Sequence, residues 1–294
     1  MADLGRASIV AVGSIVVAGG VAAAAGAALT LGGVPVPLIA FAAVFCLNGI
    51  GWVVASAQRS ERFYDLIGSA SFITVVAIVA VARVVDGRAV VAVSDVAPWI
   101  PLVLVSLWAV RLGSFLFARI RETGVDGRFD QMKTSPARFA VPWSLQALWV
   151  ILTVMPAVVV SSSPSPSGIA VAVGSSVWLV GFVVEVVADR QKDAFRRRRA
   201  ADASGPAFID EGLWRLSRHP NYVGEVLLWI GVFLCGVGVY QGAQWAVVTS
   251  PVTVFVLLRF VSGVPMLEAR ADARFGDDPA YQAYKARTPA FLLR

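Results

Sequence analysis

Charge is scarce in this sequence, and so are histidine and cysteine. Charged residues make up 15% of the 294 residues, whereas a soluble domain carries roughly 25%. Together with the 57% of hydrophobic residues, this deficit excludes a soluble globular domain, a disordered chain and a collagen-like fibre. The two cysteines, Cys46 and Cys235, lie far apart in apolar runs. This placement argues against a disulfide framework and against a metal-ligand cluster.

Several catalytic signatures are also missing. The sequence has no GxGxxG after a strand, no phosphate-binding P-loop and no HExxH zinc motif. Its single histidine leaves no evident Ser/His/Asp or Cys/His arrangement for nucleophilic catalysis. A bound nucleotide is therefore expected between helices, and no metal site is expected. The net charge of +6 is first explained by basic residues beside membrane spans, so we expect no nucleic-acid partner.

Long apolar runs recur along the whole chain and predict membrane-spanning helices. Glycines and prolines at 32–37 and a Ser/Pro run at 161–168 separate neighbouring spans. The sequence therefore predicts an all-α, polytopic integral membrane helix bundle of about seven to eight transmembrane helices. Windows of about 19 residues place the spans at 9–31, 36–56, 64–82, 98–118, 142–160, 169–188, 222–239 and 245–262.

Basic residues indicate the orientation of these helices. With a cytoplasmic amino terminus and alternating helices, all 25 Lys and Arg except Arg83, Arg88 and Arg111 fall on the cytoplasmic side. Both termini are therefore expected in the cytoplasm, and the membrane is the plasma (inner) membrane if the source is bacterial. No repeat or separate soluble domain is visible, so we expect a single membrane domain over 1–294, with amino-terminal helices at 1–60. The long cytoplasmic segments are 119–141, 189–221 and 263–294.

The sole histidine lies in the run Arg218-His219-Pro220-Asn221-Tyr222, directly before the seventh span. Pro220 and Asn221 suit the start of a helix. The amino end of that helix faces the basic cytoplasmic loop with its unpaired N–H groups, so an anion is expected to bind there. The alternative is that Arg218 and His219 only contact lipid headgroups.

Carboxylates inside the predicted spans indicate a polar cavity or a charged partner. Glu225 lies about one turn into the seventh span, and Glu185 about one turn before the end of the sixth. Asp189 shares a helix face with Glu185, and Arg196 continues near that face. Arg111 in the fourth span is the expected countercharge. These groups predict a ligand pocket, and the alternative is a buried ion-pair network that only holds helices together.

A charged segment follows the last span. Arg270 and Arg274 are four residues apart and would present two guanidinium groups together, for which phosphate is a natural partner. Tyr281, Tyr284 and Lys285 follow them. A solvated helix face with alternating charges explains this segment equally well. The basic run at 196–199 is the ordinary positive-inside signal.

At these positions the sequence resembles the steroid 5α-reductase family of membrane enzymes, in particular its bacterial branch. The resemblance begins near Asp65 and extends to the carboxyl terminus, within a region that we bound at 61–294. It implies an NADPH-dependent reductase in which hydride goes to the β-carbon of an enone. The hydrophobic, steroid-like or lipid substrate then lies inside the helix bundle, and the cofactor binds from the cytoplasm. The strongest segments are 108–112, 126–129, 185–195, 217–225 and 267–292.

The resemblance also implies a set of cofactor-binding residues, and we add the three neighbouring motif residues Arg218, Tyr222 and Tyr284 to it. The full set is Arg111, Arg128, Glu185, Asp189, Arg196, Arg218, His219, Asn221, Tyr222, Glu225, Arg270, Arg274 and Tyr284.

The family's catalytic residues match this sequence less well. Trp108 stands where the resemblance places a catalytic tyrosine, and an indole is a poor proton donor. The family's glutamate has no clear counterpart, and the nearest acid group is Asp65, together with Tyr64. Hydride addition builds charge on the enone oxygen, so a donor must stabilise it there.

Two rival functions remain open from the sequence. The isoprenylcysteine carboxyl methyltransferases, which use S-adenosylmethionine, also have an Arg-His-Pro element before a membrane helix and a late tyrosine. Their cofactor has no phosphate, so the basic residues at 196, 218, 270 and 274 favour NADPH. A transporter or lipid-binding scaffold would show an internal repeat or broken helices, and neither is visible. The expected partners are a hydrophobic small molecule and membrane lipids, with the oligomeric state open.

Overall fold

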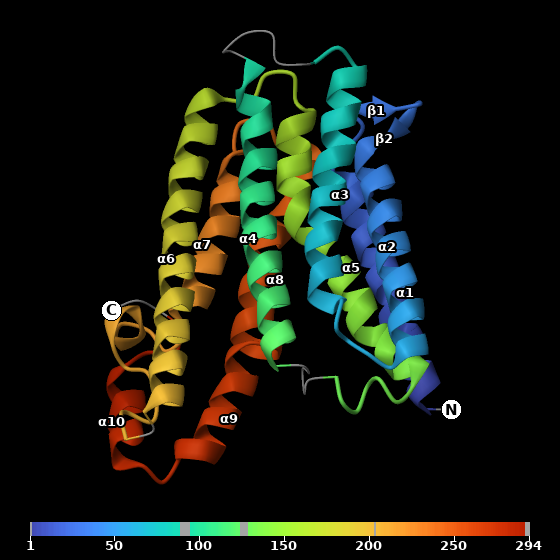
Figure 1. The fold of residues 1–294 in the computed structure, drawn as a ribbon. Coiled ribbons are helices and arrows are strands. Elements are labelled where there is room, and N and C mark those ends of the chain that lie inside the picture. Colours follow the sequence, from blue (N-terminus) through green and yellow to red (C-terminus); the bar gives the residue numbers. More distant parts are fainter. Residues whose placement is uncertain (1, 89–94, 124–128, 203, 292–294) are drawn as a thin grey trace. The chain divides into compact units, whose positions relative to one another are not determined.

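The computed structural model describes residues 2–88, 95–123, 129–202 and 204–291. Helices account for 77% of the chain, which confirms the predicted all-α class. Short elements accompany the helices: strands β1 (Thr30–Leu31) and β2 (Val34–Pro35), the 3₁₀ segments η2 (Ala97–Trp99), η3 (Gly212–Arg215) and η4 (Gly242–Val248), and the π-helical η5 (Leu257–Val261). The α-helices are α1 (Ala2–Ala24), α2 (Val36–Gln58), α3 (Tyr64–Val85), α4 (Ile100–Thr123), α5 (Pro136–Ser162), α6 (Gly168–Ala201), α7 (Pro220–Leu234), α8 (Thr249–Val256), α9 (Val264–Phe275) and α10 (Pro279–Arg287) (Figure 1).

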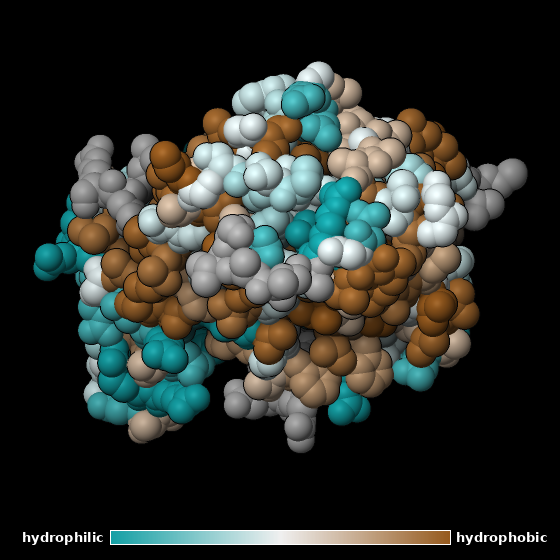
Figure 2. Space-filling model, turned by 90° about the horizontal axis from the view of Figure 1, so that it is seen from above, coloured by the Kyte–Doolittle hydropathy of each residue, from teal (hydrophilic) through white to brown (hydrophobic). Residues whose placement is uncertain are grey.

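Seven helical segments in the described part of the chain are long and apolar enough to cross a membrane. Large apolar side chains point outward on them: Ile9 on α1 is 74% exposed, and Ile169 on α6 is 79% exposed. Figure 2 shows apolar residues over much of the surface in view. Lipid is the environment in which such faces are stable, so the chain is an integral, multi-pass membrane protein.

The internal contacts divide the chain into two compact units. Unit 1 comprises Met1–Ser175 and Val232–Ser250, and unit 2 comprises Ser176–Gly231 and Pro251–Arg294. The division crosses α6 and α7, so each of these helices contributes residues to both units. The single membrane domain over 1–294 stays a prediction.

In unit 1, α5 is the central helix, and α1, α2, α3 and α4 pack against it. Every residue of α5 from Val150 to Ser162 is buried. Glycines allow the close approach of neighbouring helices. A Cβ on Gly51 of α2 would overlap the ring of Trp143, and one on Gly68 of α3 would lie 2.8 Å from the amide of Gln146. Small residues at such crossings are how membrane helices pack closely without a hydrophobic driving force between them.

Two arginines satisfy the carboxyl end of α5. Arg83, in the last turn of α3, is 2% exposed, and its guanidinium donates to the carbonyl oxygens of Ser161 and Ser163. Arg88 donates to the carbonyl oxygen of Ser162 at 2.8 Å. The last carbonyls of a helix have no partner within the helix, and a cation there also interacts favourably with the helix dipole. The two arginines that the sequence places on the outer side therefore hold the end of the central helix.

The first helix is shorter than the predicted span. The apolar run predicts a helix to residue 31, but α1 ends at Ala24, and Gly26 adopts a positive φ of 89°. The chain then forms an antiparallel hairpin, β1 with β2, around Gly32 and Gly33, whose φ angles are 60° and 79°. A two-residue hairpin turn requires positive φ, which glycine adopts without strain. An apolar run of this kind cannot reveal that its end belongs to a turn.

The seventh predicted span is also shorter than expected. The sequence predicts it over 222–239, but α7 has 15 residues and ends at Leu234. Tyr240 turns back on this end: its hydroxyl donates to the Phe233 carbonyl at 2.7 Å, and its ring occupies the space of a Cβ at Gly236. This return of the chain ends the helix, although the sequence remains apolar.

In unit 2, α6 and α7 cross at two glycines. A Cβ on Gly224 would lie 2.6 Å from the backbone nitrogen of Glu185 and 2.6 Å from the carbonyl oxygen of Gly181. The two backbones are therefore in contact. Glu225 directly follows Gly224, so the crossing brings the backbones at the two predicted membrane carboxylates close together.

Candidate functional site

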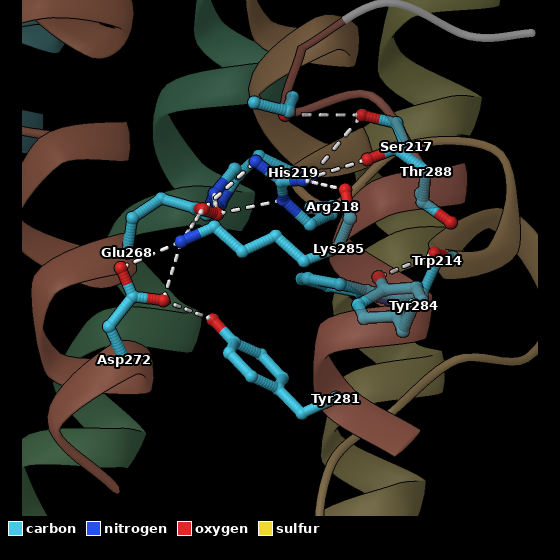
Figure 3. Close-up of polar contacts among 11 residues, drawn as sticks. Trp214, Ser217, Arg218, His219, Glu268, Asp272, Tyr281, Tyr284, Lys285 and Thr288 are labelled. Carbon is cyan, nitrogen blue, oxygen red and sulfur yellow. Dashed lines mark hydrogen bonds and ion pairs between the residues drawn. The ribbon is translucent and has the colours of Figure 1, made fainter. Parts of the chain in front are cut away.

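A buried histidine at the start of α7 is paired with a partly buried glutamate of α9 (Figure 3). His219 directly precedes Pro220, the first residue of α7, as the sequence predicts for a helix start. Its side chain is 7% exposed, and its Nε2 lies 2.8 Å from Oε1 of Glu268 in α9. The imidazole stacks on the ring of Tyr222, with 5.6 Å between centroids. The pair therefore links two segments that are far apart in the sequence.

Arg218 is the second partner of Glu268. Its Nη2 lies 2.9 Å from Oε2 of Glu268, and its Nε donates to Oε1 at 3.1 Å. Its Nη1 donates to the carbonyl oxygens of Lys285 and Thr288 at 2.7 and 2.8 Å. These carbonyls belong to the carboxyl end of α10, where a cation is favoured. Arg218 could contact an anion or a lipid headgroup only by breaking these hydrogen bonds.

A second set of polar contacts joins α9 to α10 (Figure 3). Lys285 places its Nζ 2.6 and 2.7 Å from the two carboxylate oxygens of Asp272. The hydroxyl of Tyr281 donates to Asp272 at 2.9 Å. The hydroxyl of Tyr284 donates to the carbonyl oxygen of Trp214 at 2.7 Å. These bonds fix α10 against α9 and against the segment before α7.

Burial sets the protonation state of His219. Loss of solvation lowers the pKa of His219 below its ordinary value, although the hydrogen bond to Glu268 acts in the opposite direction. The imidazole is therefore neutral at pH 7, with the proton on Nε2 that it donates to the Glu268 carboxylate. Its Nδ1 is then an acceptor, and in the described part of the chain it is buried without a hydrogen-bond partner. A ligand that donates an N–H or O–H group can satisfy it.

A cavity of about 250 Å³ adjoins this network. It is lined by α6, the segment at 207–219, α9 and α10, and its walls are largely aromatic. Phe208 stacks on Tyr284 with 5.4 Å between centroids, and its ring centre lies 6.0 Å from that of Phe275. Burial raises the pKa of Tyr284, so its phenol stays protonated. Flat aromatic faces of this kind suit a nucleobase or another planar ring.

Besides Arg218, two more guanidinium groups line the same cavity, Arg196 from α6 and Arg274 from α9. Arg196 is bound to Asp193 at 2.7 Å, one turn earlier on its own helix. The sequence predicts only that Arg196 lies near the helix face of Glu185 and Asp189. Arg274 is exposed and lies over the ring of Phe275, with 5.1 Å to the ring centre. Within the residues that the structure describes, this ring is its only interaction partner, so its charge is not compensated locally.

A neighbouring cavity of about 280 Å³ lies at the end of α6. Its cations are committed to protein groups: Arg198 pairs with Glu211, and Arg199 donates to the carbonyl oxygens of Gly205 and Pro206. An anionic ligand would have to displace these contacts. The cavity beside His219 is therefore the better candidate for a ligand with a phosphate group.

The side chains that line the cavity beside His219 fit a phosphorylated nucleotide. Its rings can stack on a base, its uncompensated guanidinium can bind a phosphate, and the Nδ1 of His219 can accept from a hydroxyl or an amide. Among the described residues, no group of three His, Cys, Asp or Glu side chains could hold a metal ion.

The predicted catalytic residues, Tyr64 and Asp65, begin α3 in unit 1. The hydroxyl of Tyr64 donates to the carbonyl oxygen of Pro142 at 2.9 Å. Its ring packs against Phe129 and Trp143, with 4.8 and 5.1 Å between centroids. The phenolic hydrogen of Tyr64 is thus engaged with the backbone of α5, while Asp65 lies half-buried in the first turn of α3. The catalytic role of this pair stays a prediction.

Trp108, which stands where the related family has a tyrosine, packs inside unit 1. It is 1% exposed, and its ring centre lies 5.1 Å from that of Phe72 and 5.9 Å from that of Trp149. These edge contacts make it part of the aromatic packing between α3, α4 and α5.

The other predicted cofactor residues are distributed over both units. Arg111 lies in unit 1 on α4, with its guanidinium 5.4 Å from the centre of the Phe115 ring. Arg128 lies outside the described residues. In unit 2, Glu185 of α6 is 3% exposed at the glycine crossing. Glu225 of α7, which directly follows Gly224 of that crossing, is half-buried.

The remaining members of the set lie on α6, α7 and α9. Asp189 is half-buried, one turn after Glu185 on α6. Asn221 and Tyr222 are in the first turn of α7, and a Cβ at Gly263 would lie 2.9 Å from the Tyr222 ring. Arg270 is exposed on α9 and, unlike Arg274, does not line the cavity. The structure thus brings Arg196, Arg218, His219, Arg274 and Tyr284 together at one cavity.

Glu268 is the central group that sequence reasoning did not select. Glu268 and Asp272 are four residues apart and alternate with Arg270 and Arg274 along α9. In the structure, both acids face the polar network, and both arginines are exposed. The alternation therefore marks two faces of one helix. In the sequence, only the four-residue spacing of Glu268 and Asp272 could have indicated a buried partner for His219.

Residues 51–288 match a family described as "Protein of unknown function (DUF1295)". No curated protein and no solved structure matches the chain. The matched range includes every residue of the cavity and of the polar network beside it.

Proposed function

The chain belongs to the DUF1295 family, a steroid 5α-reductase-like family, and we therefore propose that it is a membrane-embedded reductase dependent on NADPH. Its substrate is a hydrophobic, steroid-like or lipid molecule whose enone carbon–carbon double bond is reduced. The observation that carries the proposal is the aromatic cavity beside His219, with uncompensated Arg274 on its lining.

The cavity supports NADPH through the chemistry of its lining. Phe208 and Tyr284 offer stacked aromatic faces to a base, and Arg274 offers a planar guanidinium to a phosphate. The Nδ1 of His219 accepts a hydrogen bond from a ribose hydroxyl or an amide of the ligand. S-adenosylmethionine would use the rings but has no phosphate for the guanidinium. The charges therefore favour the dinucleotide over the methyl donor.

The substrate side requires a proton donor. When bound, NADPH supplies a hydride to the β-carbon of the enone. A donor at the enone oxygen must then stabilise the developing negative charge. Asp65, in the first turn of α3, is the residue that we assign to this role. Tyr64 could contribute only after its hydroxyl leaves the Pro142 carbonyl, to which it now donates at 2.9 Å.

The first test is ligand-induced stabilisation of the detergent-purified protein. A ligand that binds only the folded state raises the midpoint of thermal unfolding. We expect saturating NADPH to raise the midpoint more than NADH does, and S-adenosylmethionine to leave it unchanged. Stabilisation by S-adenosylmethionine alone would overturn the reductase and favour a membrane methyltransferase.

The second test is turnover. With an enone substrate, the wild-type protein should consume NADPH and yield the saturated ketone. Asp65→Asn should lower kcat at least tenfold while leaving the stabilisation by NADPH intact. Asp277→Asn, which removes an exposed carboxylate beyond α9, is the matched control and should leave kcat unchanged. An Asp65→Asn protein with full activity would remove Asp65 as the donor.

A further inference from the structure

We infer that the cavity beside His219 takes the adenosine end of the dinucleotide, and that Arg274 reads the phosphate by which NADPH differs from NADH. This assignment rests on the proposed function and specifies which end of the cofactor binds there. It also names one specificity-determining residue.

The size and walls of the cavity indicate a nucleoside. Its volume of about 250 Å³ is below the roughly 300–1,000 Å³ of pockets for drug-sized ligands. It can therefore enclose one nucleoside but not a whole dinucleotide. Phe208, Tyr284 and Phe275 supply flat faces within one cluster, with ring centres 5.4 and 6.0 Å apart from that of Phe208. A planar purine suits these faces.

Among the guanidinium groups of the cavity, Arg274 is the one without an acidic partner in the described residues. Glu268 is bound by Arg218 and His219, so its negative charge is neutralised inside the protein. Asp193 is shared by Arg196 and Arg197, at 2.7 and 2.9 Å. In the stretch of chain that the structure describes, Arg274 has only the ring of Phe275 beside it. A phosphate monoester, with nearly two negative charges at pH 7, is the partner that this guanidinium fits best.

The position of Arg274 agrees with the 2′-phosphate in particular. In NADPH this monoester is attached to the ribose next to the adenine, so a nucleoside in the aromatic cavity carries it to the cavity lining. Arg270, one turn earlier on α9, is exposed but does not line the cavity. The sequence spacing suggests that Arg270 and Arg274 bind phosphate together, but only Arg274 is therefore placed to do so.

The experiment measures nucleotide affinity of the full-length, detergent-purified protein by calorimetry. The variants are Arg274→Gln and, as matched control, Arg197→Gln, which removes the same charge from an exposed position on α6 that does not line the cavity. We expect Arg274→Gln to weaken NADPH about tenfold, as for one lost charge-assisted contact, and to leave NADH unchanged. The Arg197→Gln protein should keep the wild-type preference. Adenosine 2′,5′-bisphosphate should compete with NADPH, and adenosine 5′-monophosphate should compete at least tenfold less well.

The outcomes separate this inference from the proposed function. If the wild-type protein binds NADPH but Arg274→Gln keeps its preference over NADH, the assignment of Arg274 is wrong and the reductase stands. If adenosine 2′,5′-bisphosphate fails to compete with bound NADPH, the placement of the adenosine end is wrong. If neither dinucleotide binds the wild-type protein, the proposed function itself is overturned. Arg274 is exposed, so unchanged thermal midpoints of the unliganded variants serve to show that both are folded.

Discussion

His219 is the only histidine of the chain, so its titration can be observed without overlap from other imidazoles. Two opposing influences act on it. Burial disfavours the charged imidazolium, and the Glu268 carboxylate 2.8 Å away favours it. Burial is the larger influence, so the neutral ring is the working state of the site. A neutral ring keeps Nδ1 as an acceptor, whereas an imidazolium would offer a second donor instead.

We predict that His219 titrates below its ordinary pKa of 6.5. The nitrogen-15 NMR spectrum of the histidine-labelled protein should show the tautomer protonated at Nε2 at pH 7. Glu268→Gln removes the charge that raises this pKa, so the titration should shift to still lower pH. A wild-type pKa above 6.5 would contradict the dominance of burial.

The same shift makes stability depend on pH with a definite sign. The unfolded chain protonates His219 below about pH 6.5, while the folded chain keeps it neutral to lower pH. This contribution to stability is therefore complete above pH 6.5, and it is lost as the pH falls from 6.5 to the folded-state pKa. His219→Gln should flatten this part of the profile of unfolding midpoint against pH.

Sequence reasoning reached His219 but not its partner, for a physical reason. Pro220 after His219 marks a helix start through local backbone preferences, which are visible within a few residues. Glu268 lies 49 residues further along the chain. Its contact depends on how α7 and α9 pack, which no local pattern contains. Arg196 binds Asp193, three residues earlier on α6, a partner that the sequence analysis did not select.

At the scale of elements, the carboxyl end of α5 depends on Arg83. We predict that Arg83→Met lowers the free energy of unfolding by about 2–3 kcal/mol, because the buried carbonyl of Ser161 and the partly buried carbonyl of Ser163 lose a charged donor. Thermal unfolding in detergent should show a midpoint lower by several degrees. Arg62→Met, at an exposed arginine before α3, is the control and should leave the midpoint nearly unchanged. An equal midpoint for both variants would mean that Arg83 does not hold the helix end.

The crossing of α6 and α7 gives a second prediction at this scale. Gly224→Ala should destabilise the protein by about 2–3 kcal/mol, since its Cβ would lie 2.6 Å from the backbone of α6. The displaced crossing should also weaken NADPH binding, because α7 carries His219 at its amino end. Gly49→Ala, in α2 with open space around its Cβ, tests the general effect of alanine in a membrane helix and should be neutral. NADPH affinity and the thermal midpoint, measured on both variants, decide the prediction.

Apolar runs predict where helices lie, but not where two of them end. The run to residue 31 contains no charge, yet the hairpin of β1 and β2 ends the helix at Ala24. The run to 239 is equally apolar, yet Tyr240 turns back to the Phe233 carbonyl. In both cases the end is fixed by a turn or a side-chain contact. Hydropathy averages over such features and therefore extends the helix beyond them.

For the whole molecule, composition alone was sufficient for the class of protein. A chain with 57% hydrophobic residues must place apolar side chains on its surface, and the outward residues of α1 and α6 do so. The function could not be derived in the same way. The cavity is formed by side chains from four segments, and its character depends on which charges are paired. The sequence lists those charges but not their pairing.

The topology of the chain depends on whether α7 crosses the membrane. With about 1.5 Å per residue, the 15 residues of α7 span about 22 Å, less than the hydrocarbon thickness of about 30 Å. However, Gly181 approaches Leu228 while Glu185 approaches Gly224, so α7 runs antiparallel to α6. We infer that α7, with the residues after it, returns the chain through the membrane as an eighth crossing.

An even number of crossings places both termini on one side, and the basic residues indicate the cytoplasm. We predict that a fluorescent protein which matures only in the cytoplasm is bright when fused to either terminus. A fusion truncated after Ser165, in the Ser/Pro segment between α5 and α6, should be dark. A bright amino-terminal fusion with a dark carboxyl-terminal fusion would show that α7 does not return through the membrane. The polar network of α9 and α10 would then face the opposite side from the cytoplasmic pool of NADPH, and the proposed reductase would lose its cofactor supply.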